Sequence, residues 1–444
     1  MSLLLTVASV MLLTCGAYFT LKFRAFYILH PIKTLRSVPK NGVKHMLLSL
    51  GGTVGVGNIA GVSVAIALGG SGAVLWMIIG ALVAMALKYA EITLGMLHRG
   101  GATVYIEKTL GSIAASLFAV LLIADAIVMG GVIQSGAVSE AIHVSFGISY
   151  VVSGIMLSML AAAVFFFKID LFGLSSVIVP FMSVGYVVCA LAVILLNAEQ
   201  IPQTVQSIFS EAFDTKAAAG GALGFVFTPA MRQGIVKGLF SNEAGCGTAP
   251  MAHAASAEKV PARQGLFGVF EVFVDTVLMC TLTAFTILLT GVEPAGGVRT
   301  CIEAFGTVFG AVASPILAIS VLLFAFSAIV SFGYYGTKCL EYFKAGDTGR
   351  SVFLIAYCLS VFVGAALSPA ASWKIADMVV CFMLILNTSA VVCSRKEIFT
   401  AHNAFYSQMG KYSHKASKTR SLSPVSIKNA SPMSDTDINR GSML

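Results

Sequence analysis

Residues 51–61 read Gly-Gly-Thr-Val-Gly-Val-Gly-Asn-Ile-Ala-Gly, and residues 238–250 read Gly-Leu-Phe-Ser-Asn-Glu-Ala-Gly-Cys-Gly-Thr-Ala-Pro. Each of these stretches interrupts an apolar segment that is long enough to enter a membrane. Glycine and proline weaken helix and leave backbone N–H and C=O groups without helical partners. In a bilayer such groups are tolerated only where they line a cavity inside the protein. Interrupted helices at matching positions of two halves therefore predict a transporter binding site.

The composition is that of a polytopic membrane protein. Of the 444 residues, 57% are hydrophobic and 11% are charged, whereas soluble domains carry about 25% charged residues. The net charge of +8 comes from basic residues in loops and in the tail, so it does not indicate nucleic-acid binding. Nine cysteines are scattered without a metal-binding spacing. We therefore expect packing thiols rather than a disulfide framework or a zinc site, and no enzymatic cofactor.

About eleven segments approach the length of roughly 20 apolar residues that crosses a bilayer. The first is expected to be an uncleaved helix, because no Lys or Arg precedes it. The expected spans are 3–21, 46–69, 71–97, 110–143, 149–167, 173–196, 230–256, 264–291, 308–335, 351–369 and 374–394.

The distribution of basic residues predicts the orientation. The loop 22–45 holds six Lys and Arg residues, and the basic residues of later alternate loops and of the C-terminal tail fall on the same side. The loop 197–221 on the other side holds three acidic residues and one lysine. Because cytoplasmic loops are rich in Lys and Arg, we expect the N-terminus outside and the C-terminus in the cytoplasm, in the inner membrane of a bacterium.

An all-α architecture with an internal repeat follows from the spans. Residues 1–22 are expected to form one N-terminal helix, and residues 46–196 and 217–394 to form two repeats of five helices. Each repeat opens with a broken helix, and an odd number of helices in each makes the repeats inverted in the membrane. Residues 217–229 are expected to form a short external helix. Residues 400–444 are polar and basic, and we expect a disordered cytoplasmic tail.

The first glycine-rich break suits both an anion and a cation. The helix is expected to resume near Asn58, and the N–H groups at a helix start attract a carboxylate. The preceding half-helix ends in free carbonyl groups that suit a small cation, and Asn58 adds a neutral oxygen. The alternative is that the glycines serve close helix packing.

The second break and the helix near Gln134 add further candidates. Glu243 is ionisable at membrane depth, which makes it a functional candidate; it either holds a cation, carries a proton, or accepts hydrogen bonds from freed amides. Phe240 either covers an apolar group of the substrate or belongs to the core. The carboxamide of Gln134 can donate and accept hydrogen bonds, as a zwitterionic ligand requires, or can join two helices.

Glu271 and Asp275 lie one helical turn apart, so they share a helix face. Paired carboxylates can perform acid–base catalysis. However, no nucleophile, metal-ligand set or protease signature accompanies them. We therefore expect them to have a structural or gating role and the protein not to be an enzyme.

These glycine-rich breaks resemble the alanine or glycine:cation symporter family. The resemblance runs from about Leu12 to Ser394 and implies a fold similar to that of leucine-transporter-like sodium symporters, which move small amino acids with sodium. Further segments that carry it are Gly-Gly-Ser-Gly-Ala at 69–73, Lys-Tyr-Ala-Glu at 88–91, Phe-Val-Asp-Thr at 273–276, Cys-Thr-Leu-Thr at 280–283 and Tyr-Tyr-Gly at 334–336.

The resemblance also implies roles for single positions. The break would bind the substrate carboxylate, chiefly through the backbone N–H groups of Val56 and Gly57. The positions expected to bind substrate are Thr53, Gly55, Val56, Gly57, Gln134, Phe240, Ser241 and Phe332, with Phe240 and Ser241 in the unwound part of the second broken helix. The positions matched to a sodium site are Gly51, Val54 and Ser327, to which the argument above adds Asn58.

This chain departs from the family pattern at several positions, so cation and substrate preference stay open. The family usually has Thr at Val56, Thr at Ala328 and Trp at Phe332. Loss of the hydroxyl at Ala328 removes a cation ligand, and Phe332 in place of Trp enlarges the pocket. Residues 100–105 read Gly-Gly-Ala-Thr-Val-Tyr, where the family usually has Gly-Gly-Pro-Met-Tyr-Tyr.

The expected function is therefore sodium-coupled symport of alanine or glycine, with the small amino acid, sodium and the lipid bilayer as partners. A proton-coupled amino-acid transporter is the alternative, and a channel or a membrane-embedded enzyme fits the sequence less well. The sequence makes no prediction about the oligomeric state.

Overall fold

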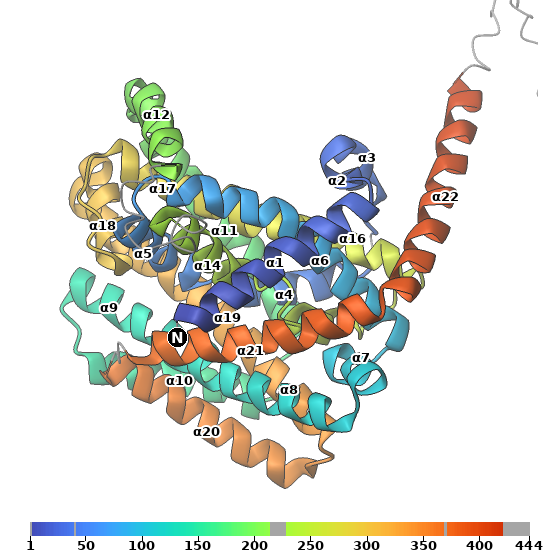
Figure 1. The fold of residues 1–444 in the computed structure, drawn as a ribbon. Coiled ribbons are helices and arrows are strands. Elements are labelled where there is room, and N and C mark those ends of the chain that lie inside the picture. Colours follow the sequence, from blue (N-terminus) through green and yellow to red (C-terminus); the bar gives the residue numbers. More distant parts are fainter. Residues whose placement is uncertain (1, 40, 214–227, 368–370, 421–444) are drawn as a thin grey trace, which may run out of the picture. The chain divides into compact units, whose positions relative to one another are not determined.

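The computed structural model describes residues 2–39, 41–213, 228–367 and 371–420, and this part of the chain is all-helical (Figure 1). The chain divides into two units, residues 1–402 and residues 403–444. The helices that build the first unit are described below.

The N-terminal part and the first repeat-like half follow one another along the chain. The N-terminal helices are α1 (Ser2–Lys22), α2 (Phe26–Leu29) and α3 (Pro31–Ser37). The first half then comprises α4 (Val43–Thr53), α5 (Ala60–Gly69), α6 (Ala73–His98), α7 (Gly101–Leu110), α8 (Ser112–Asp125), α9 (Gln134–Phe146), α10 (Tyr150–Phe166) and α11 (Leu171–Leu196).

The second half repeats this order of elements. It comprises α14 (Pro229–Asn242), α15 (Thr248–His253), α16 (Pro261–Val272), α17 (Thr281–Leu289), α18 (Gly297–Phe309), α19 (Ala313–Tyr342), α20 (Gly346–Leu367) and α21 (Ala371–Cys393). A broken helix opens each half, and a short connecting helix, α7 or α18, precedes the third long helix of each half. The expected leucine-transporter-like order of helices is thus confirmed, whereas the repeat boundaries stay predictions.

In the described part of the chain, eight helical segments are long and apolar enough to span a membrane, and a ninth is the pair α4–α5, which bends by 57°. We expected about eleven spans. The other two expected segments are α10, which has 17 residues, and the broken helix α14–α15, whose halves have 14 and 6 residues. Their shortness explains why hydropathy and length alone do not identify them as spans.

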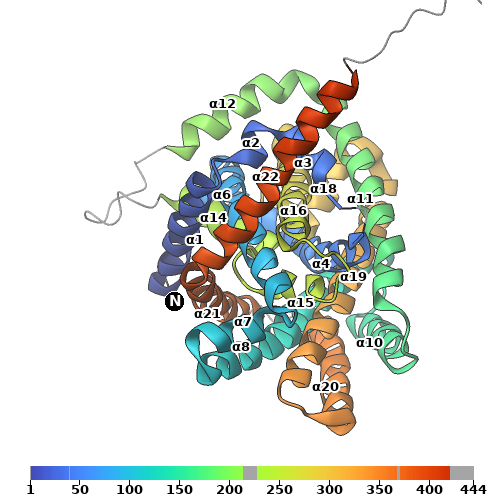
Figure 2. The ribbon, with the colours of Figure 1, turned by 90° about the vertical axis from the view of Figure 1, so that its right-hand side faces the viewer.

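Large apolar side chains cover the lipid-facing positions of the outer helices, as in Met159, Val177 and Phe181, which are 67–71% exposed. By contrast, residues 51–60 of the first break and residues 238–250 of the second are buried. Figure 2 shows α4, α15 and α19 with α10 and α11 on one side and α1 and α21 on the other. α6 packs against α14 and α16, and α10 packs against α20.

Two helices lie in segments that we expected to be an acidic loop and a disordered tail. The stretch expected to be an acidic loop contains α12 (Ile201–Ala212), because Thr204, Ile208 and Ala212 recur every four residues and are buried. Part of the tail that we expected to be disordered belongs to α22 (Arg395–Arg420), a stretch without proline. The short helix expected at 217–229 and the tail beyond residue 420 lie largely or wholly outside the described residues.

An aromatic cluster joins the N-terminal helices to α6 and to the start of α22. The His402 ring lies 4.6 Å from the ring centroid of Phe23 and 5.4 Å from that of Phe26. Its Nδ1 is 2.9 Å from the Tyr89 hydroxyl. Burial lowers the pKa of His402, which lies outside the membrane spans, from 6.5 to about 4. The His402 imidazole is therefore neutral in the folded protein at neutral pH.

This cluster predicts an acid-sensitive fold. Between pH 6.5 and 4 the unfolded His402 binds a proton that the folded one does not, so the free energy of unfolding falls as the pH falls through this window, by up to roughly 3 kcal/mol. His402→Phe keeps a ring in place and removes the titration. We expect the melting temperature of the purified protein to fall more steeply between pH 6.5 and 4 in wild type than in this variant.

The exposed His30 supplies the control for this experiment. His30→Phe should keep the pH dependence of the wild-type melting temperature. Equal slopes in wild type and His402→Phe would show that His402 does not carry the acid sensitivity.

Candidate functional site

The first break is an opened turn between α4 and α5. α4 ends at Thr53, Gly55 is extended, and Val56–Asn58 forms a single 3₁₀ turn before α5 begins at Ala60. Two side chains hold this turn: Val56 N–H donates to Gln134 Oε1 at 3.1 Å, and Gly55 N–H donates to Asn58 Oδ1 at 3.0 Å. Gln134 thus contacts the break through a bond between helices, which was one of its two expected roles, and its role in substrate binding stays a prediction.

Some backbone groups of this turn remain free. Among the described residues, no acceptor receives the Gly57 N–H and no donor reaches the Val54 C=O. Gly57 lies at the positive end of the helix that resumes after the break, so its N–H is available to an anion. The Val56 N–H, which we expected to act with it, is already occupied by Gln134.

Residues of α19 line the opposite side of the break. A side chain at Gly51 would collide with Ser327 Oγ, and one at Gly55 would lie 3.4 Å from Ala328. The Ser327 hydroxyl is buried and has no hydrogen-bond partner in the described part of the chain. Gly51 and Ser327 are therefore neighbours, and Val54 follows Gly51 by one helical turn.

Three further predicted site residues, Thr53, Phe332 and Asn58, have partners within the protein. Thr53 Oγ1 donates to Leu50 O of its own helix at 3.2 Å. Phe332 is buried, and a side chain at Gly130 would collide with it. Asn58, predicted as a cation ligand through its oxygen, uses that oxygen to accept from Gly55. Whether these residues bind substrate or cation stays a prediction.

The second break is narrower than we expected. α14 continues through Asn242, so Phe240 and Ser241 lie in its last turn and not in the unwound stretch. The helix ends at Glu243, which has φ 50°, and Gly245 and Gly247 also have positive φ. The reason is that the helical bond from Glu243 N–H to Leu239 O, at 2.8 Å, is still made.

Side chains of other helices bond part of the backbone of the second break. Glu91 Oε2 accepts from Gly247 N–H at 3.1 Å and from Asn387 Nδ2 at 2.8 Å, and Asn387 also donates to Gly245 O. Glu243 Oε2 accepts from the Thr248 hydroxyl at 2.6 Å. Glu243 therefore accepts a hydrogen bond from a hydroxyl at the start of α15. One of its expected partners was a freed backbone amide.

Asp275 connects the two broken helices. Its Oδ1 accepts from Asn58 Nδ2 at 2.9 Å, and its Oδ2 accepts from the Ser241 hydroxyl at 2.7 Å and from the Thr276 hydroxyl at 2.8 Å. A side chain at Gly57 would lie 3.5 Å from the Ser241 Cα, so the two breaks also pack directly. Asp275 is completely buried and was missing from the predicted site.

Glu271 belongs to a different network, although it lies one turn from Asp275. It pairs with Lys88 at 3.6 Å and with His253 at 2.6 Å, and accepts from Ser49 at 2.9 Å. Lys88 Nζ also donates to Asn242 O, at the end of α14, at 2.6 Å. The two carboxyl groups therefore belong to two separate hydrogen-bond networks: Asp275 connects the two broken helices, and Glu271 bonds Lys88, His253 and Ser49.

Two π-helical segments accompany the site. Ala126–Ile133 precedes Gln134, and Phe273–Cys280 contains Asp275. A π-helical segment changes which side chains of a long helix face inward, and such segments occur often at functional sites. They position Gln134 and Asp275 toward the breaks.

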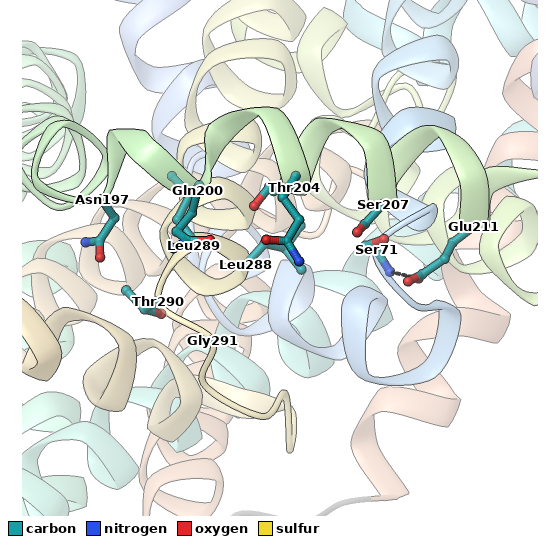
Figure 3. A pocket seen from close by; sticks show the side chains of 11 residues that line it. Ser71, Asn197, Gln200, Thr204, Ser207, Glu211, Leu288, Leu289, Thr290 and Gly291 are labelled. Carbon is teal, nitrogen blue, oxygen red and sulfur yellow. Dashed lines mark hydrogen bonds between the residues drawn. The ribbon is translucent and has the colours of Figure 1, made fainter.

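A cavity of about 550 Å³ lies elsewhere, between α12 and residues 288–291 (Figure 3). It is lined mainly by polar side chains, and Glu211 accepts from Ser71 N–H at 2.7 Å on its wall. None of its lining residues belongs to either break. Because the breaks themselves are buried, the structure shows them closed to solvent.

Comparisons with known proteins agree with this architecture. A model of the sodium:alanine symporter family matches residues 2–419. The sodium/alanine symporter AgcS of Methanococcus maripaludis is 34% identical over 380 residues, which cover 80% of this chain and 83% of AgcS. The putative sodium/proton-dependent alanine carrier protein YrbD of Bacillus subtilis is 34% identical over 387 residues, which cover 80% and 78%.

The fold has a solved counterpart at low sequence identity. The crystal structure of MhsT in complex with L-phenylalanine superposes with a TM-score of 0.60 at 13% identity, and the match covers 80% of this chain and 89% of MhsT. The helix order, the two breaks and the family match lead to one conclusion: this multi-pass membrane protein is a transporter that belongs to the sodium:alanine symporter family.

Proposed function

We propose that the protein carries a small neutral amino acid, alanine or glycine, across the membrane together with a monovalent cation, sodium. The observation that carries this proposal is the pair of free polar groups at the first break. In the second break, Glu91 accepts from Gly247 N–H and Asn387 donates to Gly245 O. The first leaves the Gly57 N–H and the Ser327 hydroxyl unpaired and buried within the described structure. Unpaired buried polar groups are costly unless a ligand uses them.

The substrate carboxylate would bind at the first break. Gly57 N–H offers one donor at a helix start, where a negative charge is favoured. Gln134 keeps its carboxamide nitrogen, which donates to no other described residue, for the second carboxylate oxygen. If the substrate takes over the Val56 N–H as well, Gln134 must release it, so binding and rearrangement of Gln134 are linked.

The backbone geometry favours a small substrate side chain. Gly55 lies against the Gln134 carboxamide and Ala328, and Gly57 lies against Ser241. Little room therefore remains between α5 and α14 for a large group. AgcS, one of the relatives, is named for alanine, which supports alanine as the first substrate to test.

The cation would bind beside Gly51, Val54 and Ser327. Two carbonyl oxygens and a hydroxyl are hard ligands that suit an alkali cation. Asn58 would position the turn through its bonds to Gly55 and Asp275, and would supply its oxygen to a cation only if the Gly55 bond opened. Ala328 offers no hydroxyl, so we propose a weaker sodium site than a threonine would give.

Proton coupling is the second candidate, and the charge of the buried region favours it. Glu91, Asp125, Glu243 and Asp275 are buried with no ion pair among the described residues, and Lys88 is paired with Glu271. Excess buried negative charge attracts either a metal cation or a proton. The relative YrbD carries both ions in its name.

Uptake into proteoliposomes tests the function directly. Radiolabelled alanine and glycine should accumulate when a sodium gradient is imposed, and less with potassium alone. Accumulation that ignores sodium and follows a proton gradient would support the second candidate. Ion current without saturable uptake would indicate a channel, and new products formed from the amino acids would indicate an enzyme.

Gln134→Ala tests the substrate site. The variant removes the partner of the Val56 N–H and the proposed donor to the carboxylate, so we expect the apparent affinity for alanine to fall by roughly 1–3 kcal/mol. Ser139→Ala removes a buried hydroxyl of the same helix that bonds to no described residue and should leave the affinity unchanged. An unchanged KM in Gln134→Ala would exclude Gln134 from the site.

A sodium titration of alanine uptake tests the cation site. Ser327→Ala should raise the sodium concentration for half-maximal uptake by about 5- to 30-fold, the equivalent of roughly 1–2 kcal/mol. Ala328→Thr should lower it by adding a hydroxyl. Ser320→Ala is the control, because the Ser320 hydroxyl of the same helix donates to Ile316 O at 2.9 Å, two turns away from Ser327. A Ser327→Ala variant with the wild-type sodium dependence would contradict the assignment.

A further inference from the structure

Lys237 is a buried cation between two aromatic rings. It lies on α14 one turn before Phe240 and is only 9% exposed. Its Nζ lies 5.0 Å from the ring centroid of Phe240 and 5.0 Å from that of Trp373 on α21. Among the described residues it makes no ion pair, although Asp377, one turn beyond Trp373, is close enough to interact electrostatically.

A buried ammonium is costly at membrane depth, and side chains of this kind mark functional positions. Here the negative faces of two aromatic rings stabilise the charge. Asp377 Oδ1 is buried without a hydrogen-bond partner in the described structure, so the ammonium contacts the rings in preference to the available carboxylate. The free energy of the buried ammonium therefore depends on where the Phe240 ring lies.

The position of Phe240 connects this sandwich to the proposed substrate site. A side chain at Gly57 would meet the Cα and Cβ of Ser241, at 3.5 and 3.9 Å, and the backbone carbonyl oxygen of Phe240, at 4.0 Å. The opposite face of α14 is fixed on α6, because a side chain at Gly238 would lie 3.2 Å from Met77. Lys237 therefore links the free amide at Gly57, through Phe240, to α21.

We propose that Lys237 is a positioning residue for closure of the site: its ammonium holds the Phe240 ring and fastens α14 to Trp373 of α21, and so keeps the backbone of Phe240 and Ser241 against the break at Gly57. This proposal rests on the proposed function. The three residues lie in the half of the protein that the loop charges predict to be external, so the sandwich would close the path from outside. Without the ammonium the ring is released and the substrate dissociates faster.

Equilibrium binding of radiolabelled alanine to the purified protein tests this role. Lys237→Met keeps the length of the stem and removes the charge; we expect a rise in Kd of roughly two- to thirtyfold, carried by a faster dissociation rate. Lys237→Arg keeps a cation that can stack on both rings and should restore binding to within about twofold of wild type.

Two control variants are needed. One tests whether the effect comes from an ion pair with Asp377, and the other tests whether removing any ammonium that lies near an aromatic ring weakens binding. Asp377→Asn should leave the Kd within about twofold of wild type, because Lys237 and Asp377 form no ion pair. Lys338→Met removes an ammonium 5.6 Å from the Tyr334 ring that is already paired with Glu341 at 2.8 Å, and should not change binding. If Asp377→Asn reproduces the effect of Lys237→Met, an ion pair and not the sandwich closes the site.

A second measurement does not depend on the substrate. The chain has two tryptophans, so Trp76→Phe leaves Trp373 as the single tryptophan, whose emission can be excited selectively over that of tyrosine. In this background we measure quenching of the Trp373 fluorescence by acrylamide. We expect the quenching constant with Lys237→Met to be at least about twice that with Lys237 or with Lys237→Arg, because the indole face is uncovered. Equal quenching in all three proteins would overturn the proposal, whereas absent alanine binding by wild type would overturn only the proposed function.

Discussion

Backbone groups released by a break in a membrane helix must find a partner, and this requirement shapes the centre of the protein. In the second break, Glu91, Asn387 and Asn242 bond part of the released backbone. In the first break, the described side-chain partners of the backbone are Gln134 and Asn58. In the proposed mechanism, the Gly57 N–H and the Val54 C=O, which these two side chains leave free, are the groups that a ligand would use.

Asp275 makes the two breaks depend on each other. Because its two carboxylate oxygens accept from Asn58 and from Ser241, a movement of either broken helix changes the hydrogen bonds of the other. A fully buried carboxylate that loses one of these donors is strongly destabilised. Movement of α5 relative to α14 therefore requires that Asp275 move with one of them or that another cation or donor replace the lost bond.

The sequence predicted the breaks and Gln134 because glycine clusters and an isolated amide in an apolar helix are visible without a structure. It misplaced the second break, since Gly238 serves packing against Met77 and the helix ends only at Glu243. It missed Asp275 because regular helical spacing pairs this residue with Glu271, whereas the π-helical segment Phe273–Cys280 turns the two carboxyl groups toward different networks. The amphipathic helix α12 was too short and too polar to separate from a loop.

If a cation binds as proposed, the buried charges would give it a structural role in addition to being transported. Lys88 pairs with Glu271 and bonds the end of α14, and among the described residues it makes no ion pair with Asp275. Asp275 is close to the break that offers free oxygens, and a cation bound there would offset its charge over a short distance in a medium of low dielectric constant. Binding of the cation would then stabilise the contact between α5 and α14 that forms the amino-acid site. In this way two ligands that need not touch can bind cooperatively, because each favours the same closed arrangement of the two broken helices.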